Sequence, residues 1–387
     1  MFEIVDAQHN GTVIKVIGVG GAGGNAVDHM IRNGVAGVEF VAANTDAQAL
    51  FRGSSKAQIQ LGATGLGAGA KPEAGRAAAL EARDQITEAL RGAHMVFITA
   101  GMGGGTGTGA APVIAEVAKE MGILTVAVVT KPFSHEGVKR LRAAETGIEE
   151  LTQHVDSVIV ILNEKLEEVL GEDVTMEEAF ASADSVLKNA VAGISEIINV
   201  PGLINVDFQD VRTVMAEQGM AMMGSASSSG IDRARFAAEQ AVASPLLEGV
   251  NLSGARGVLV NITANRASLK MREAREIMNT IRGFAADDAT VILGAVYDDA
   301  MSDELRVTVV ATGLGEPVAA RNPKPLQVVA QKTGTDNFPI LTDSEGYAGD
   351  LSGVIKSRRN RASTIEALQN SGMEKLDIPA FLRKQAD

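Results

Sequence analysis

A glycine-rich segment between an apolar strand pattern and a helical pattern constrains this chain more than any other feature. The strand pattern Met95–Ala100 leads through Gly101-Met102 into Gly103-Gly104-Gly105-Thr106-Gly107-Thr108-Gly109, and the helical pattern Val113–Met121 follows. Glycines allow successive backbone N–H groups to converge on an anion, and a helix N-terminus adds partial positive charge. Thr106 and Thr108 can add hydroxyl donors. This order of strand, glycine turn and helix predicts a phosphate site rather than a merely flexible loop.

The predicted phosphate site is not a P-loop. No lysine lies in the segment, and Gly-x-x-x-x-Gly-Lys-Ser/Thr occurs nowhere in the chain. Backbone dipoles and a metal ion must then offset the phosphate charge, so a bound nucleoside triphosphate is expected to require Mg²⁺. The chain has no Cys and only five His, which excludes disulfides and thiolate metal sites. We identify no protein side chain as a metal ligand.

Two further glycine turns precede helical patterns. The turn Gly18–Asn25 contains Gly-x-Gly-x-x-Gly, a weak signal that keeps a nicotinamide or flavin dinucleotide site open, with Asp46 as a candidate ribose ligand. The turn Gly65–Pro72 is explained equally well as a surface loop. Two phosphate-facing turns in one sheet favour a polyphosphate chain over a dinucleotide.

Alternating strand and helical patterns in the first part of the chain predict an α/β fold with a mostly parallel sheet. The strand patterns are Val13–Val19, Val38–Ala43, Met95–Ala100, Ile123–Thr130 and Ser157–Leu162. A capping box, Thr175-x-x-Glu178, then begins a long helical pattern that ends before Pro201. About 25 residues at roughly 1.5 Å each span about 37 Å, enough to join two domains. Gly193 within this helix predicts close packing there.

The second part of the chain predicts a smaller α+β domain. Helical patterns cover Val211–Met223, Arg233–Ala243 and Arg272–Ala285, and strand patterns cover Gly257–Thr263, Thr290–Tyr297 and Leu305–Thr312. The alternation within these strands favours a small sheet with one buried face. After about Glu316 the periodicity fades, which is typical of a flexible linker.

Two pairs of charged residues have both a structural and a functional interpretation. Asp207 and Asp210 could be the N-cap and N3 residues of a helix, and the residues alone favour that interpretation. The alternative is that they orient an attacking water. Glu136 and Arg140 lie four residues apart and could form a solvated ion pair or line a ligand site.

Charge and hydropathy limit the partners and the compartment. The formal net charge of −13 disfavours direct binding to nucleic acid or anionic membranes. Met1–Asp6 lacks the basic and apolar regions of a signal peptide, and no apolar run approaches the roughly 20 residues of a membrane span. These features predict a cytoplasmic protein. The terminal Leu376–Lys384 combines apolar anchors with two cations and is typical of a docking peptide, with a frayed terminus as the alternative.

The quoted motifs together resemble one family. Gly103–Gly109 closely resembles the tubulin/FtsZ signature, Asn205–Asp210 resembles the loop after that family's central helix, and the resemblance to FtsZ covers nearly all of 12–315. It implies a tubulin/FtsZ-like fold with a mostly parallel sheet, a long central helix and a smaller second domain. The implied parts are an N-terminal extension (1–11), a GTP-binding domain (12–174), a central helix (175–201), a GTPase-activating domain (202–316), a flexible linker (317–372) and a partner-binding peptide (373–387).

The resemblance also implies a function and a site. It implies a GTPase that binds GTP, GDP and Mg²⁺, polymerises head-to-tail into filaments of the mid-cell division ring, and hydrolyses GTP between adjacent subunits. Asp207 and Asp210 would act on the neighbour's GTP, Phe180 would stack on the base, and Asp184 would read it. The implied nucleotide contacts are Gly21, Ala22, Asn25, Asn44, Asp46, Ala70, all residues from Gly103 to Gly109, Glu136, Arg140, Asn163, Phe180 and Asp184. The implied contacts with tethers of the FtsA and ZipA type are Leu376, Ile378, Phe381 and Leu382.

Two segments depart from the family pattern. His135 stands where an aromatic Phe is common, and residues 266–272 are more basic than usual, for which a solvated basic edge is the favoured interpretation. Three functions therefore stay open: a polymerising GTPase, a dinucleotide-dependent oxidoreductase, and a structural polymer in which nucleotide is only a cofactor.

Overall fold

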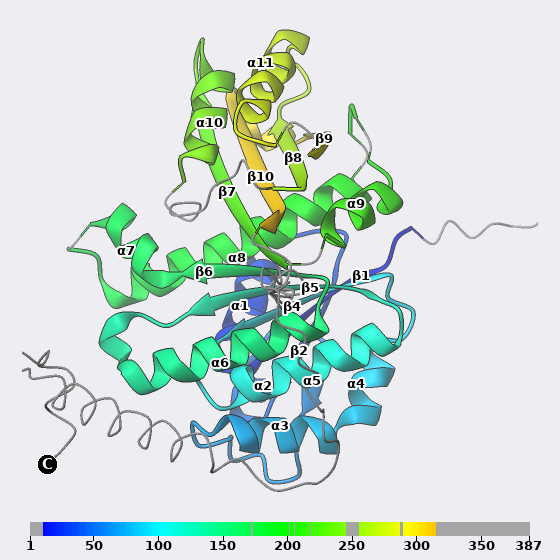
Figure 1. Cartoon of the computed structure of the whole chain (residues 1–387), viewed down its shortest axis with the longest axis vertical. Coiled ribbons are helices and arrows are strands. Elements are labelled where there is room, and N and C mark those ends of the chain that lie inside the picture. The colour runs from blue at the N-terminus through cyan, green and yellow to red at the C-terminus, as the bar shows by residue number, and fades with distance from the viewer. Residues whose placement is uncertain are drawn as a thin grey trace, which may run out of the picture. The chain divides into compact units, whose positions relative to one another are not determined.

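The computed structural model describes residues 11–171, 173–200, 202–204, 206–217, 219–244, 255–286 and 289–314 (Figure 1). The strands are β1 (Ile14–Val19), β2 (Glu39–Asn44), β3 (Ala57–Gln60), β4 (Met95–Gly101), β5 (Leu124–Lys131), β6 (Ser157–Leu162), β7 (Gly219–Ser229), β8 (Gly257–Ala264), β9 (Thr290–Tyr297) and β10 (Glu304–Leu314). The helices are α1 (Gly20–Arg32), α2 (Ala47–Arg52), α3 (Pro72–Glu81), α4 (Arg83–Leu90), α5 (Thr106–Glu120), α6 (Val138–His154), α7 (Asn163–Leu170), α8 (Met176–Asn199), α9 (Phe208–Met215), α10 (Arg233–Val242) and α11 (Met271–Arg282), with the 3₁₀ turns η1 (Ser134–Glu136) and η4 (Asp299–Met301). Residues 1–10, Asn205, the predicted linker and the terminal peptide Leu376–Lys384 lie outside the described residues.

Six parallel strands form the first part of the sheet, in the order β3-β2-β1-β4-β5-β6. Successive side chains of a strand point to opposite faces. In β1, Val16 belongs to a buried cluster that includes residues of α1 and α8, whereas Ile17 and Val19 belong to a second cluster with α3, α4, α5 and α6. Helices therefore cover both faces, and the strand patterns read as nearly continuous apolar runs for this reason.

Helix α8 is the long helix that the sequence predicts, and its capping box is present. The Thr175 hydroxyl accepts from the Glu178 backbone N–H at 3.2 Å, and a Glu178 carboxylate oxygen accepts from the Thr175 N–H at 3.0 Å. The predicted close packing at Gly193 is also confirmed, because the Asn261 side chain donates to the Gly193 carbonyl at 3.1 Å. A Cβ on Gly193 would lie 3.1 Å from Thr308. None of the helices in the described ranges is both long and apolar enough to cross a bilayer.

The second part of the chain extends the same sheet. β7 pairs in parallel with the start of β6 and antiparallel with β10, and β8 lies between β10 and β9. Val260 and Ile262 of β8 pack in a cluster with α10 and α11, and Asn261 points the other way, toward α8. Every residue of β8 is buried. The prediction of one buried face is therefore wrong for this strand, because its polar side chains face a helix and not water.

One predicted helix is corrected, and one strand was not predicted. The predicted helix Val211–Met223 ends at Met215, and Gly219–Met223 belong to β7. The helical spacing of Val211, Val214 and Met215 ends there, and the consecutive buried residues that follow fit a strand covered on both faces. The edge strand β3 has no counterpart among the predicted strands, since its four residues include a single buried one and give almost no pattern.

The basic segment 266–272 contacts the buried side chain of Arg233. The buried Arg233 guanidinium forms a two-point ion pair with the buried Glu273 carboxylate, at 2.8 and 3.1 Å, and also donates to the Ser268 carbonyl at 2.8 Å. Arg266 lies over the Tyr297 ring at 5.1 Å. These contacts give the segment a defined conformation while leaving the charges of Arg266 and Lys270 exposed.

Candidate functional site

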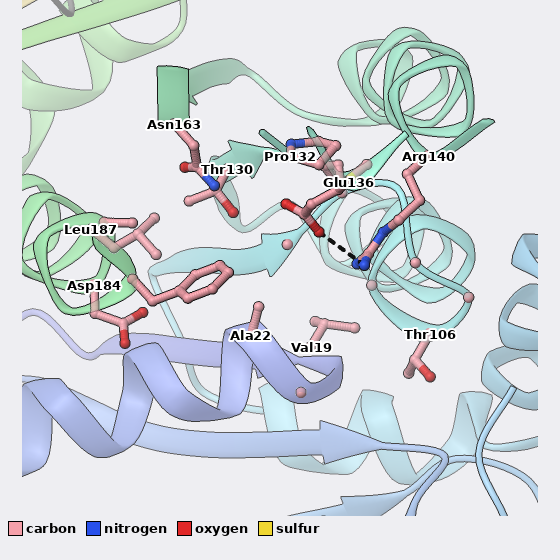
Figure 2. Close-up of a pocket in the computed structure, with 18 residues that line it drawn as sticks. Val19, Ala22, Thr106, Thr130, Pro132, Glu136, Arg140, Asn163, Asp184 and Leu187 are labelled. Carbon is pink, nitrogen blue, oxygen red and sulfur yellow. Dashed lines mark ion pairs between the residues drawn. The ribbon is translucent and has the colours of Figure 1, made fainter. Parts of the chain in front are cut away.

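A cavity of about 280 Å³ opens at the carboxyl ends of the parallel strands (Figure 2). Val19 ends β1, Gly101 ends β4, and Asn163 follows β6. The order of the parallel strands reverses between β1 and β4, the topological switch point at which open α/β sheets bind ligands. The lining residues are Val19, Gly21, Ala22, Gly101, Met102, Gly104, Gly105, Thr106, Gly107, Thr130, Pro132, Glu136, Arg140, Asn163, Phe180, Ala183, Asp184 and Leu187.

Two helices begin at this cavity, and their first turns contain no acidic residue. α1 starts at Gly20 and α5 at Thr106, so two sets of free backbone N–H groups and two positive dipole ends meet there. A Cβ on Gly20, whose φ is +74°, would lie 3.0 Å from the Gly107 nitrogen, whereas a Cβ on Gly104 would meet no described atom within 4 Å. Glycine at 20 lets the two turns touch, and Gly104 leaves room for a ligand.

The two threonines of the glycine segment have different roles. Thr106 lines the cavity, and its hydroxyl lies 2.6 Å from the Thr45 hydroxyl in the loop after β2. The Thr108 hydroxyl is buried and accepts from the Gly103 backbone N–H at 2.8 Å. The Thr108 side chain therefore stabilises the turn. The sequence predicts a hydroxyl donor at both positions, but only Thr106 lines the cavity.

Glu136 and Arg140 form an ion pair at the rim. Arg140 Nη1 lies 2.8 Å from a Glu136 carboxylate oxygen, and the Glu136 side chain is mostly buried while Arg140 is half-exposed. The two residues are on different elements, η1 and α6. Because both line the cavity, the pair is a part of the site wall and not only a solvated helix contact.

Asn163 supplies a buried acceptor that lacks a partner. Its side chain is 4% exposed, and its Oδ1 atom has no hydrogen-bond partner among the described residues. A buried polar atom without a partner is costly. At a cavity wall such an atom is suited to a ligand hydroxyl or N–H group.

Helix α8 contributes one face to the cavity wall. Phe180, Ala183, Asp184 and Leu187 recur at helical spacing and place an aromatic ring, a carboxylate and aliphatic groups side by side. Burial raises the pKa of Asp184 to about 6, and the charge of Arg32 partly opposes this shift. A half-buried carboxylate in such a wall favours a ligand with N–H donors.

Several predicted contacts do not line this cavity. Asn25 and Asn44 line a neighbouring cavity of about 180 Å³ that shares Gly21. Asp46 caps α2 by accepting from the Gln48 N–H at 2.8 Å and does not line this cavity, which weakens the dinucleotide interpretation. Ala70 has a left-handed φ of +56°, and its loop packs against Gly105. The remaining predicted contacts that do not line the main cavity are Gly103, Thr108 and Gly109.

Sequence reasoning missed seven lining residues. Val19, Gly101 and Thr130 could have been found, because each stands at the carboxyl end of a predicted strand. Ala183 and Leu187 follow from helical spacing around Asp184. Met102 and Pro132 carry no comparable signal.

The acidic pair is remote from this cavity. Asp207 caps α9 by accepting from the Asp210 backbone N–H at 2.8 Å, and both side chains are exposed. Capping, the interpretation favoured from the residues, is therefore confirmed. From Asp184 to Asn199, α8 rises about 22 Å at roughly 1.5 Å per residue. The pair follows that far end, and the ring of Phe208 beside it lies 6.2 Å from that of His94, at the amino end of β4, whereas the cavity lies at the carboxyl end of that strand.

Comparisons with known proteins agree over the whole chain. The profile of the Tubulin/FtsZ family, GTPase domain, matches residues 13–171, and that of the FtsZ family, C-terminal domain, matches residues 219–315. Cell division protein FtsZ of Pseudomonas aeruginosa is 55% identical over 399 residues, covering 100% of both chains. Its counterpart in Coxiella burnetii is 54% identical over 389 residues, covering 99% of both. A solved structure of an empty FtsZ dimer of M. jannaschii is 44% identical with a TM-score of 0.75, over 80% of this chain and 89% of that one.

The raised pKa of Asp184 predicts a pH-dependent stability. We expect Asp184→Asn to stabilise the ligand-free chain at about pH 8 by on the order of 1 kcal/mol, discounted for solvent screening, because Asn has no charge to desolvate. The carboxyl titrates at about 6 in the fold against an ordinary 3.8. The difference in the free energy of unfolding between Asp184→Asn and the parent chain should therefore vanish below about pH 4 and reach its full value above about pH 6. Urea unfolding at several pH values measures it.

The matched control is Glu304→Gln, which neutralises an exposed carboxylate. A stability gain for Asp184→Asn that does not change with pH would contradict the assignment.

Proposed function

The chain belongs to the FtsZ family of tubulin-like cell-division GTPases, and we propose that it hydrolyses GTP at the joint between two copies of itself in a filament. Membership brings GTP binding, GTPase activity and self-assembly for cell division. The observation that carries the finer proposal is the separation, within one chain, of the cavity from the exposed acidic pair Asp207 and Asp210. We assign GTP binding to 12–174, the central helix to 175–201 and GTPase activation to 202–316.

The phosphates would occupy the side of the cavity where α1 and α5 begin. Backbone N–H groups of the two glycine turns would donate to them, with Thr106 as a hydroxyl donor. The ribose would contact Glu136, Arg140 and Asn163, which gives the unpartnered Asn163 oxygen a donor. The wider set of proposed nucleotide contacts comprises Gly21, Ala22, Asn25, Asn44, Asp46, Ala70 and Gly103 to Gly109.

The base would lie between Phe180 and Asp184 on α8. A carboxylate can accept from both N1–H and the exocyclic amine of guanine, and adenine has no such pair of donors on that edge. Aromatic stacking on Phe180 would add affinity for any base. Asp184 is thus the proposed source of guanine selectivity.

Mg²⁺, when bound, would offset the charge of the triphosphate. Among the described residues, no three His, Cys, Asp or Glu side chains gather closely enough to hold a metal ion. We therefore propose that the phosphate oxygens supply most of its ligands.

Asp207 and Asp210 would complete the site of the adjacent subunit. A subunit interface that joins one end of a molecule to the opposite end of the next builds an open filament when its rotation does not close into a ring. The carboxylates at the far end of α8 would then face the neighbour's phosphates and orient the attacking water as a general base does. Assembly and hydrolysis would be coupled by this geometry.

A shared site predicts that the GTPase rate per molecule depends on concentration. We expect the specific rate to rise above a threshold protein concentration, since isolated molecules lack the acidic half of the site. Phosphate release across a dilution series measures this. A constant specific rate would contradict a site made by two subunits.

Complementation between two inactive variants tests the same site directly. Asp210→Ala should bind GTP yet lower the turnover number by about 10²-fold, the typical contribution of general acid–base catalysis. Asp184→Ala should lose GTP binding but keep its acidic loop. We expect the GTPase rate of a mixture to exceed the summed rates of the separate variants. The intact nucleotide cavity of Asp210→Ala would meet the intact acidic loop of Asp184→Ala at their joint. If mixtures that co-assemble show no gain in GTPase rate, Asp210 has no catalytic role and belongs only to the cap of α9.

We also propose that the terminal peptide attaches filaments to membrane tethers of the FtsA and ZipA type at the mid-cell ring, on the cytoplasmic side. Its anchors would be Leu376, Ile378, Phe381 and Leu382. Deletion of Leu376–Lys384 should leave GTP turnover unchanged and abolish binding to a purified tether. Equal affinity of the truncated and full chains for the tether would refute the proposal.

A further inference from the structure

Three aromatic rings form a row at the edge of the cavity. The ring of Phe133 lies nearly parallel to the His135 imidazole, with centroids 5.2 Å apart and planes at 20°. The Phe180 ring meets Phe133 edge-on, with centroids 5.5 Å apart and planes at 86°. Phe133 is 3% exposed, whereas Phe180 is 43% exposed. The buried ring therefore connects an outer imidazole with the ring that lines the cavity.

The position of Phe133 is fixed by the backbone around it. Its N–H donates to a Glu136 carboxylate oxygen at 3.0 Å, and its carbonyl accepts from the Glu136 N–H at 3.1 Å. Glu136 also pairs with Arg140 at the rim. One short turn thus holds both the aromatic row and the polar rim of the cavity, and Phe133 has little freedom to move.

Phe180 needs such support because almost half of its side chain is open to solvent. Edge-to-face contact places the positive edge of one ring against the negative face of the other and favours one relative orientation. A side chain already held in its binding orientation loses less conformational entropy when a ligand arrives. A fixed Phe133 would therefore raise the affinity of any ligand that stacks on Phe180.

His135 covers Phe133 from the solvent side. An imidazole presents a flat ring to its neighbour and polar nitrogens to water, so it suits an exposed position over a buried aromatic ring. His135 itself is exposed and does not line the cavity. The imidazole can therefore act on a ligand only indirectly, and the ring that it contacts is Phe133.

We propose that Phe133 and His135 are positioning residues for the nucleobase, forming behind Phe180 a support that holds the stacking ring ready for guanine. The inference rests on the proposed stacking of the base on Phe180. It adds a determinant of nucleotide affinity that makes no direct contact with the nucleotide.

The first experiment tests base stacking alone. The chain has no Trp, so Phe180→Trp places the only Trp of the chain on the proposed platform, and excitation at the long-wavelength edge of Trp absorption avoids the two Tyr. GDP should quench its emission, and inorganic pyrophosphate, which has no base, should not. Equal emission with and without saturating GDP would overturn both the base-stacking proposal and this inference.

The second experiment tests the support. With Phe180 intact, His135→Ala removes one aromatic contact and Phe133→Leu removes two, and each should weaken GDP binding by about two- to tenfold. Binding of pyrophosphate should stay unchanged, since it uses only the glycine turns. In GTP turnover, KM should rise while kcat at saturation stays near that of the parent chain.

Two further variants separate support from general damage. His135→Phe places a flat ring at this position and should keep the GDP affinity of the parent chain. Phe236→Ala removes a ring in the second part of the chain that is 45% exposed, close to the 43% of Phe180, and GDP affinity should not change. Because His135 is exposed, His135→Ala keeps the inference testable even if Phe133→Leu does not fold. Quenching in Phe180→Trp together with unchanged GDP affinity in His135→Ala would overturn the inference and leave the base-stacking proposal standing.

Discussion

The close approach of two glycine turns at the carboxyl ends of β1 and β4 is the constraint on which the rest of the site depends. Gly20 lies so near the Gly107 nitrogen that a side chain there would crowd the second turn. This contact brings the first residues of α1 and α5 together and concentrates two helix dipoles on one small volume. The absence of acidic residues from both first turns leaves that positive potential for a ligand. No lysine is then needed at the site.

Helix α8 joins this site to the remainder of the protein. Its early turns line the cavity through Phe180 and Asp184, and its later turns pack against the second part of the sheet through Gly193. Farther along, Glu196 pairs with Arg306 of β10 at 3.4 Å. α8 is one continuous helix from Met176 to Asn199, so its two ends lie about 35 Å apart at roughly 1.5 Å per residue. The helix therefore separates the two halves of the proposed active site by a nearly fixed length.

How far the sequence could predict the fold depended on whether local patterns carried the information. The capping box at Thr175 and the strand Ser157–Leu162 were predicted correctly because both are visible in neighbouring residues. The first residues of β7, Gly219–Met223, were assigned to a helix, since the consecutive buried residues of this strand reflect cover on two faces that only the assembled sheet provides. The strand Gly257–Thr263 was expected to have only one buried face, and its Asn261 in fact faces a helix. The edge strand β3 has no counterpart among the predicted strands, because a strand of four residues depends mainly on its partner.

The sequence by itself determined the glycine turn between a strand and a helix, the exclusion of a P-loop, the long helix and the family resemblance. These features depend on residue types at short spacing, and their chemistry is local. Only the tertiary structure decided which residues share the cavity wall. It placed Thr108 in the turn, Asp46 at a helix cap and Asn163, with its unpartnered oxygen, at the cavity wall. It also placed the acidic pair at the far end of α8, because the direction in which a side chain points depends on strand register and helix packing, which bring together residues distant in the chain.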